Sequence, residues 1–294
     1  MKYTLTLIGN STTALGDAHI AGAIALLPSP GAPDWLAPGL ACDIGFEAED
    51  GKAIEAAIRA KLSGAGIDLA VQTAGTRRKG LLVADMDSTI IQQECIDELA
   101  AELGIKDRIS AITERAMRGE IAFEPALKER VGLLKGLPLA ALEKVYRERI
   151  VETPGGRALV RTMRANGATC ALVSGGFTFF TEKVAAAVGF NLNRANTLIF
   201  ADGALTGEVG EPILGRYAKI ESLVNLRDEL KLAPHATMAV GDGANDLGMI
   251  EEAGLGVAFH AKPVVAEAAD ARIDHGDLTA LLYLQGYRRE EIAG

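Results

Sequence analysis

Four short runs of apolar residues constrain the fold of this chain more than any other feature. They lie at residues 81–84, 169–173, 237–240 and 255–259. Each is nearly uninterrupted, as is typical of a parallel strand that is buried on both faces of a sheet. Because helical patterns separate the runs, the sequence predicts an α/β fold with a doubly wound parallel sheet, that is, a Rossmann-like core.

Two segments within this core depart from simple strand–helix alternation. The segment from about residue 92 to residue 155 shows helical patterns without a convincing strand. It is too long for a simple crossover connection between two parallel strands. We therefore predict an inserted helical cap. Residues 198–206 carry two apolar stretches around Asp202-Gly203, which predicts a β-hairpin.

The chain before the first apolar run has a different pattern. Strand-like runs occur at residues 2–8, 40–48 and 67–72, and residues 52–62 form an amphipathic helical pattern. A proline-rich stretch from residue 27 to residue 38, which includes Trp35, is predicted to be an exposed loop.

These patterns predict two domains. The first is a small α+β domain over residues 1–76, and the second is the core with its cap over residues 77–294. The polar, basic stretch at residues 73–80 is the predicted linker between them.

Composition argues against several functions. The 294 residues include 30 Lys and Arg against 39 Asp and Glu, a net charge of −9, which disfavours broad binding to nucleic-acid phosphates. The chain begins without the apolar run of a secretory signal, and no stretch approaches the ~18 uninterrupted apolar residues of a membrane span. The three cysteines are widely spaced and lack the paired spacing of a zinc site or a redox motif, which predicts a reduced setting. We expect a cytoplasmic protein that binds neither nucleic acid nor membrane.

Polar clusters follow three of the four apolar runs. Asp85 and Asp87 follow the first run, Ser174-Gly175-Gly176 follows the second, and Asp242 and Asp246 follow the third. Ligands of open parallel sheets bind beyond the carboxyl ends of the strands, so these clusters should converge. A single Asp-x-Asp pair is common in helix caps and turns, but four carboxylates in one crevice need a compensating cation. Oxygen ligands without histidine favour Mg²⁺ over zinc.

A phosphate group would also need hydrogen-bond donors. Ser174 offers a hydroxyl, and Gly175 and Gly176 offer backbone N–H groups at a predicted helix N-terminus, a favourable place for an anion. Two plainer interpretations exist: an ordinary strand-to-helix turn for these residues and a solvated helix lysine for Lys219. A dinucleotide loop at residues 241–246 is disfavoured because its last glycine position is Asp246.

The ordered motifs resemble a known family. Asp-x-Asp-x-Thr, then Ser174, then Lys219, then Gly-Asp-Gly-x-Asn-Asp form the four-part pattern of the haloacid dehalogenase superfamily of phosphotransferases. Over roughly residues 80–285 the chain is most similar to the phosphoserine phosphatase branch. The resemblance implies Mg²⁺-dependent hydrolysis of phosphoserine through an aspartyl-phosphate, the last step of serine biosynthesis. The alternative is action on another small phosphomonoester, or transfer of the phosphoryl group to another alcohol.

The resemblance also implies roles for individual residues. Asp85 would be the nucleophile, and Asp87 would act first as general acid and then as general base. The implied ligands of Mg²⁺ are the carboxylates of Asp85 and Asp242 and the backbone carbonyl of Asp87, with Asp246 as a candidate support. The candidate phosphate-binding residues are Ser174, Gly175, Lys219 and Asn245.

Substrate choice is expected to come from the cap. Glu94 and Arg130 carry opposite charges that suit an ammonium and a carboxylate, and arginine is the natural bidentate partner of a carboxylate. Met117 and Phe123 are candidates for closing the pocket against water. The plainer alternatives are surface helix charges for the first pair and ordinary core residues for the second.

The small N-terminal domain resembles ACT-type or ferredoxin-like regulatory domains in its order of strands and helices. No motif in residues 1–76 indicates an effector. A docking module, or a dimerisation module that joins two copies of the chain, is the alternative to an effector-binding domain. A regulatory protein with an inert phosphatase half is disfavoured because the set of candidate catalytic residues is intact.

Overall fold

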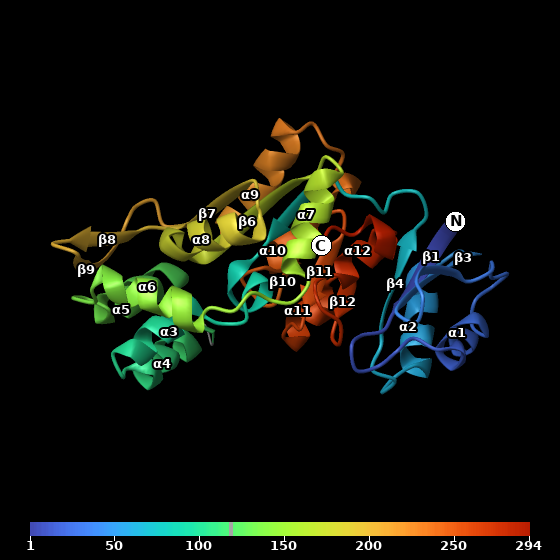
Figure 1. The fold of residues 1–294 in the computed structure, drawn as a ribbon, viewed down its shortest axis with the longest axis horizontal. Coiled ribbons are helices and arrows are strands. Elements are labelled where there is room, and N and C mark those ends of the chain that lie inside the picture. The colour runs from blue at the N-terminus through green and yellow to red at the C-terminus, as the bar shows by residue number, and fades with distance from the viewer. Residues whose placement is uncertain (118–119) are drawn as a thin grey trace.

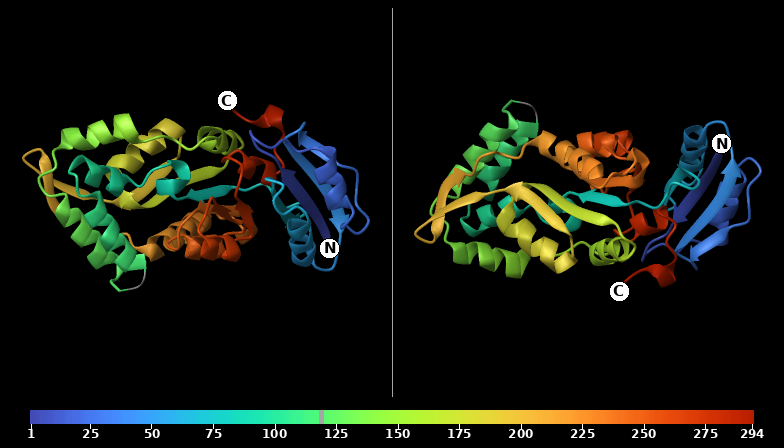
Figure 2. Two further views of the ribbon diagram at one scale, coloured as in Figure 1. Left: turned by 90° about the horizontal axis from the view of Figure 1, so that it is seen from below. Right: turned by 90° about the horizontal axis from the view of Figure 1, so that it is seen from above.

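The computed structural model describes residues 1–117 and 120–294, which form an elongated molecule (Figure 1). The N-terminal unit lies at one end, the parallel core in the middle and the helical cap at the other end. Figure 2 shows the same order from two further directions. Within the described residues, no helix is both long enough and apolar enough to cross a membrane.

The core contains the predicted parallel sheet. Its strands run parallel in the spatial order β12-β11-β10-β5-β6-β7. The four apolar runs are confirmed as strands. The strand bounds are β5 (Leu81–Ala84), β6 (Thr169–Phe177), β7 (Leu192–Asn196), β10 (Thr237–Gly241), β11 (Gly256–Phe259) and β12 (Ala271–Ile273).

Helices cover both faces of this sheet, which explains why its strands are apolar throughout. Leu82 and Ala84 pack on the face that also buries side chains of α7, α8 and α12. Leu81 and Val83 point to the opposite face, with side chains of α9, α10 and α11. The helix bounds are α7 (Gly156–Ala165), α8 (Thr178–Val188), α9 (Arg216–Glu229), α10 (Leu247–Glu252), α11 (Pro263–Ala268) and α12 (Ala280–Leu284).

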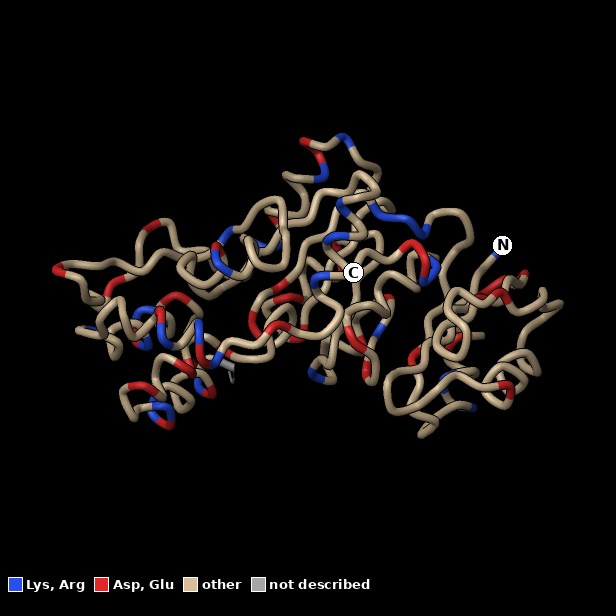
Figure 3. The backbone as a smooth tube through the Cα atoms, viewed as in Figure 1, with Lys and Arg blue, Asp and Glu red and all other residues tan. Residues whose placement is uncertain are grey.

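The cap is inserted between β5 and β6, as the sequence predicts. Its helices are α3 (Cys95–Glu102), α4 (Lys106–Met117), α5 (Phe123–Leu133) and α6 (Leu139–Arg149). The chain enters and leaves the cap side by side, through an antiparallel bridge between Ile91 and Glu152. Figure 3 shows acidic and basic residues interspersed over these helices.

The predicted hairpin is present as β8 (Leu198–Ala201) and β9 (Ala204–Val209), with Asp202 and Gly203 at positive φ in the turn. It belongs to the core in sequence but packs on the cap in space. Gly136 N–H donates to Leu205 O at 2.8 Å, and Leu205 N–H donates to Leu137 O at 2.9 Å. The hairpin therefore joins core and cap.

The N-terminal unit has a β-α-β-β-α-β order, with an antiparallel sheet ordered β2-β3-β1-β4. This is a ferredoxin-like arrangement. Its elements are β1 (Lys2–Ile8), α1 (Asp17–Ile24), β2 (Asp34–Ala37), β3 (Ala41–Glu47), α2 (Gly51–Lys61) and β4 (Asp68–Thr73). Effector binding and pairing of two copies through this unit stay predictions.

One prediction for this unit is wrong. The stretch from residue 27 to residue 38 is not entirely an exposed loop, because it contains the edge strand β2. Trp35 is opposite Cys42 in the pairing of β2 with β3, and its side chain packs against the core of the unit. Proline is tolerated beside such a strand because an edge strand leaves part of its backbone unpaired.

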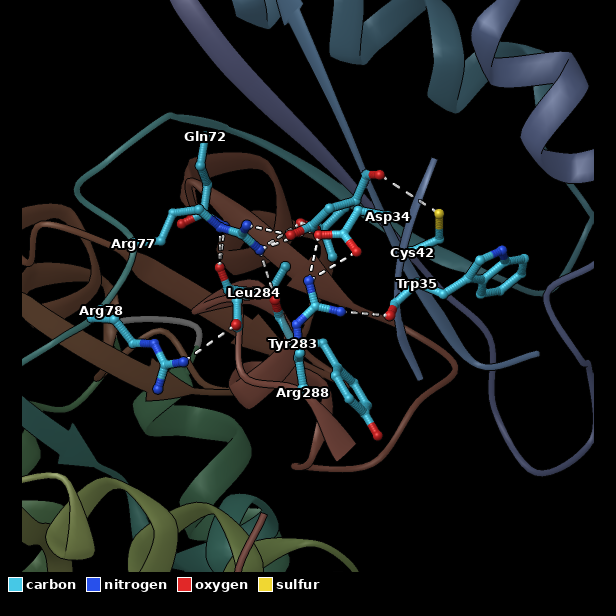
Figure 4. A network of polar contacts seen from close by, with 12 residues as sticks. Asp34, Trp35, Cys42, Gln72, Arg77, Arg78, Tyr283, Leu284 and Arg288 are labelled. Atoms are coloured by element: carbon cyan, nitrogen blue, oxygen red, sulfur yellow. Dashed lines mark hydrogen bonds and ion pairs between the residues drawn. The ribbon is translucent and has the colours of Figure 1, made fainter. Parts of the chain in front are cut away.

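The N-terminal unit is joined to the core by buried polar contacts. Arg77 pairs with Asp43, with Nη1 2.5 Å from Oδ2. The same guanidinium donates to the carbonyl oxygens of Tyr283 at 2.8 Å and Leu284 at 2.9 Å (Figure 4). Leu69 of β4 also pairs with Arg272 of β12, so the two sheets are continuous. The predicted linker at residues 73–80 is thus anchored between them.

Removal of the Arg77 guanidinium should therefore destabilise the protein. We expect Arg77→Met to lower the free energy of unfolding by about 3–5 kcal/mol, because it leaves the Asp43 carboxylate buried without its partner. Urea unfolding measures the change. The exposed Lys2–Glu47 pair offers a control, and Lys2→Met should change stability by less than about 1 kcal/mol. Equal effects of the two substitutions would contradict this account of the junction.

Candidate functional site

Asp85, Asp242 and Asp246 meet at the carboxyl ends of two neighbouring strands. Asp85 follows β5, and the loop that follows β10 carries the other two. One carboxylate oxygen from each residue lies within 4.8 Å of the others. The parallel pairing of β5 with β10 brings these residues together, because it aligns the carboxyl ends of the strands.

Lys219 of α9 lies inside this cluster. Its Nζ atom is 2.7 Å from Asp85 Oδ1 and 2.5 Å from Asp246 Oδ1. Burial alone would lower the pKa of Lys219, but the carboxylates of Asp246 and Asp85 outweigh burial and raise that pKa above its ordinary value. The lysine is therefore a fixed buried cation and not a solvated helix residue.

Further hydrogen bonds fix the loop that follows β10. The Oδ2 atom of Asp246 accepts from the N–H groups of Asp242 at 3.2 Å and Gly243 at 3.1 Å. Thr89, which is fully buried, donates from Oγ1 to Asp242 Oδ1 at 3.2 Å. Thr89 is a site residue beyond those predicted from the sequence, where its place in Asp-x-Asp-x-Thr is the available signal.

Asp87 lies in a tight turn over Met86–Ile90, in which Ser88 has a φ of 56°. A Cβ atom at Gly176 would lie 3.0 Å from Asp87 Oδ2, a tight contact, so a glycine here favours the close approach of the two residues. Burial, together with the negative charge of Glu94, raises the pKa of Asp87 to about 7. The carboxyl group can therefore hold a proton near neutral pH.

The other carboxylates of the cluster are also hard to ionise. Burial raises the pKa of Asp85 well above its usual range, and Asp246 adds to this effect. Burial and then Asp246 raise the pKa of Asp242 to about 6. Lys219 alone does not balance these negative charges. The carboxylate oxygens of this cluster are the donors that suit a hard divalent cation, which would supply the further positive charge.

Three of the four residues predicted for the metal site lie together in this cluster. The carboxylates of Asp85 and Asp242 lie together as predicted, and Asp246 is the third carboxylate of the cluster. Both oxygens of Asp246 already have hydrogen-bond partners, which fits its predicted supporting place. The expected contribution of Asp87 is its backbone carbonyl, which stays a prediction.

The residues predicted to bind phosphate at a helix N-terminus lie in a strand instead. Ser174, Gly175 and Gly176 belong to β6 and do not start a helix, because α8 begins at Thr178. The strand continues past a register shift between Val173 and Phe177 in its pairing with β7, and Gly176 lies beside Asp87. Ser174 is nearly fully buried, and its Oγ atom accepts from Gly176 N–H at 2.9 Å.

The charges of Glu94 and Arg130 in the cap interact with each other. Glu94 Oε1 accepts a hydrogen bond from Ser88 Oγ at 2.8 Å, which ties it to the turn over Met86–Ile90. Burial lowers the pKa of Arg130, whereas the negative charges of Glu94 and Asp97 act against this decrease. Asp97 is a further acidic neighbour that the sequence did not single out, because its position in the first turn of α3 suggests an ordinary helix charge.

Phe123, Asn245 and Met117 are the remaining predicted site residues. Phe123, the first residue of α5, packs over Gly175 and Gly215: a Cβ atom at these glycines would lie 3.5 Å and 3.7 Å from its ring. Asn245 is exposed, with its Oδ1 atom against Gly243. The side chain of Met117 lies outside the described residues.

The buried lysine gives a direct test of this electrostatic account. We expect Lys219→Met to lower the free energy of unfolding by about 3–5 kcal/mol without divalent cations, because buried carboxylates lose their counter-charge. Added Mg²⁺ should restore part of this loss. Lys183→Met removes the more exposed pair with Glu143 and should change stability by less than about 1 kcal/mol. A Lys219→Met protein as stable as the unsubstituted protein would refute the account.

Comparisons with known proteins agree with this geometry. Residues 82–251 match the family model of haloacid dehalogenase-like hydrolases. A phosphoserine phosphatase from Archaeoglobus fulgidus is 43% identical over 234 residues, which are 79% of this chain and 68% of that protein. A phosphoserine phosphatase from Streptomyces coelicolor is 41% identical over 257 residues, which are 87% of this chain and 62% of that protein.

Solved structures show the same similarity. A hydrolase of this superfamily from Salmonella enterica serovar Typhi has a TM-score of 0.87 at 30% identity, and the match covers 96% of this chain and 98% of that one. A phosphoserine phosphatase with an analogue of a phospho-aspartyl intermediate has a TM-score of 0.65 at 40% identity. That match covers 70% of this chain and 98% of the other.

Proposed function

The chain belongs to the haloacid dehalogenase-like hydrolase family, and from this premise we propose that it hydrolyses O-phosphoserine to serine and inorganic phosphate. The observation that carries the proposal is the buried cluster of Asp85, Asp242, Asp246 and Lys219, with Asp87 beside it. The similarity to phosphoserine phosphatases supports the choice of substrate. The reaction would be the last step of serine biosynthesis.

Asp85 is the proposed nucleophile. Its Oδ1 atom accepts hydrogen bonds from Lys219 and from Met86 N–H at 2.8 Å, so the orientation of the carboxylate is fixed. In the first step an Asp85 oxygen bonds to phosphorus as the bond from phosphorus to the serine oxygen breaks. The product of this step is an aspartyl-phosphate on Asp85.

Asp87 is the proposed proton carrier. Its carboxyl group, with a pKa raised to about 7 mainly by burial, can give its proton to the departing serine oxygen. The resulting carboxylate then takes a proton from the water that attacks the aspartyl-phosphate. Phosphate leaves, and both aspartates return to their starting states.

The proposed metal ion is Mg²⁺, held by carboxylate oxygens of Asp85 and Asp242. When bound, it neutralises charge on the phosphoryl oxygens and lets a carboxylate approach them. Lys219, Ser174 and Gly175 bind the remaining phosphoryl oxygens in this proposal. They are preorganised for this task because Lys219 and Ser174 are almost completely buried.

The cap supplies the proposed selectivity. Arg130 binds the substrate carboxylate and Glu94 binds its ammonium group, while Phe123 covers Gly175 and keeps water away from the phosphoryl group. The opposite charges of this pair match a zwitterionic amino acid. The alternative function is hydrolysis of another small phosphomonoester, or phosphoryl transfer to another alcohol, by the same aspartates.

Asp85→Asn tests the nucleophile. We expect phosphate release from L-phosphoserine with Mg²⁺ to fall by roughly 10⁴-fold or more, because the amide cannot form the covalent intermediate. Removal of Mg²⁺ with EDTA should abolish activity of the unsubstituted enzyme, and added Mg²⁺ should restore it. Mass spectrometry of the variant controls for deamidation. Persistent activity in intact Asp85→Asn would refute the assignment.

Arg130→Ala tests substrate choice. We expect kcat/KM for phosphoserine to fall roughly 10- to 100-fold, through loss of a charged hydrogen-bond partner, with little change for p-nitrophenyl phosphate. Arg147→Ala, at an exposed cap arginine, is the matched control and should leave both substrates unaffected. If the unsubstituted enzyme hydrolyses other phosphomonoesters but not phosphoserine, the substrate proposal fails and the aspartate chemistry remains.

A further inference from the structure

Asp68 is a buried carboxylate of the N-terminal unit that contacts the core. It is the first residue of β4, and its side chain is only 1% exposed. Its Oδ1 atom accepts from Asp274 N–H at 2.7 Å, and its Oδ2 atom accepts from Gly276 N–H at 2.7 Å. His275 N–H, between them, also donates to Asp68, at 3.2 Å to Oδ1. One carboxylate thus fixes three successive backbone groups of a core loop.

The fixed loop, residues 274–276, holds a second loop of the core. His260 Nε2 lies 2.8 Å from Gly276 O, and His260 N–H donates to Ile273 O at 2.8 Å. His260 has a φ of 44°, a conformation that a non-glycine residue adopts only when its surroundings hold it. The position of residues 260–262 therefore depends on the loop that Asp68 fixes.

The second loop contacts the metal-binding aspartate. Lys262 N–H donates to the backbone carbonyl of Asp242 at 3.1 Å. Hydrogen bonds thus lead from the N-terminal unit through Gly276 to His260, and the chain from His260 to Lys262 carries the connection on to the backbone of Asp242. Ordered partners behind a ligand fix its orientation and strengthen metal binding.

The two loops line an open cleft. His260 and Gly276 lie in the wall of this cleft, which has a volume of about 760 Å³, lies between the N-terminal unit and the core and extends to Ser88 in the turn over Met86–Ile90. The side chains of His260 and His275 are exposed there. Because this side of both loops faces an open cleft, hydrogen bonds contribute more than close packing to their positions.

We propose that Asp68 is a positioning residue for the metal site, acting through residues 274–276 and His260 on the backbone of Asp242. In this proposal the N-terminal unit helps to hold Asp242 in place for the metal ion, in addition to any docking role. This inference rests on the proposed function because it concerns the Mg²⁺ of that reaction. It assigns Asp68 no contact with substrate or metal.

Calorimetric titration of the full-length protein with Mg²⁺ tests the proposal without substrate. We expect Asp68→Asn to weaken Mg²⁺ binding roughly 3- to 10-fold. This is less than the effect of substituting a residue that hydrogen-bonds a metal ligand directly, because the effect of Asp68 passes through two loops. The Mg²⁺ concentration for half-maximal phosphoserine hydrolysis should rise by the same factor. At saturating Mg²⁺, kcat should stay within about twofold of the unsubstituted enzyme.

Asp43→Asn is the matched control. It weakens the Arg77 contact of the same junction but does not touch residues 274–276. We expect it to lower the melting temperature and leave Mg²⁺ affinity within about twofold. Equal weakening of Mg²⁺ binding by Asp43→Asn and Asp68→Asn would overturn the proposal, because it would show a general effect of docking. Unchanged Mg²⁺ affinity in Asp68→Asn would overturn it as well.

A second pair of variants keeps the test decisive if Asp68→Asn does not fold. His260→Ala removes the side-chain contact with Gly276 O, whereas His260→Gln keeps an N–H donor of similar reach. Both have the same backbone strain, so their difference isolates the hydrogen bond. We expect the alanine variant to weaken Mg²⁺ binding and the glutamine variant to restore much of it. Equal affinity in the two variants, or no Mg²⁺ binding by the unsubstituted protein, would overturn the proposal.

The two proposals can fail separately. If the unsubstituted protein binds Mg²⁺ but does not release phosphate from phosphoserine, the proposed function fails. The calorimetric comparison of Asp68→Asn with Asp43→Asn still decides the positioning role in that case. If phosphoserine is hydrolysed and Mg²⁺ affinity is the same in all variants, only the positioning role fails.

Discussion

The ion pairs of Lys219 with Asp85 and Asp246 are the interaction on which the rest of the site depends. They occupy an almost fully buried position, where an unpaired charge would be strongly destabilising. Lys219 comes from α9, whereas the aspartates follow β5 and β10, so the pairs also connect a helix to two strands. The same contacts that stabilise the core therefore hold Asp85, the proposed nucleophile, in one orientation.

The N-terminal unit connects to the core through similar buried polar groups. Arg77 and Asp68 together bind backbone groups at residues 274–276, Tyr283 and Leu284. The contacts of Asp68 lead through residues 274–276 and His260 to the backbone of Asp242, which is why we expect the unit to tune metal affinity and not kcat.

The sequence predicted the strands and the convergence of polar residues well because both are local or topological. Uninterrupted apolar runs specify strands buried on two faces, and parallel pairing aligns their carboxyl ends. The extension of β6 through Gly176 and the pairing of β2 with β3 depend on partners distant in sequence, so local turn signals do not reveal them. The same holds for Thr89 and Asp68, because a threonine or aspartate near a strand end has no distinctive signal in the sequence apart from its partner.

The electrostatics of the site give a physical reason for placing the cap next to the core. Buried carboxylates with raised pKa values make the cluster a poor place for negative charge until a cation arrives, and only then can a phosphate group approach. In the proposed reaction, Phe123 covers Gly175 and excludes water, which strengthens the attraction between a cation and phosphoryl oxygens. The hairpin β8–β9 connects the cap to the core at a second place, apart from the bridge between Ile91 and Glu152. In this proposal the cap strengthens the interactions that the core provides, in addition to selecting the substrate.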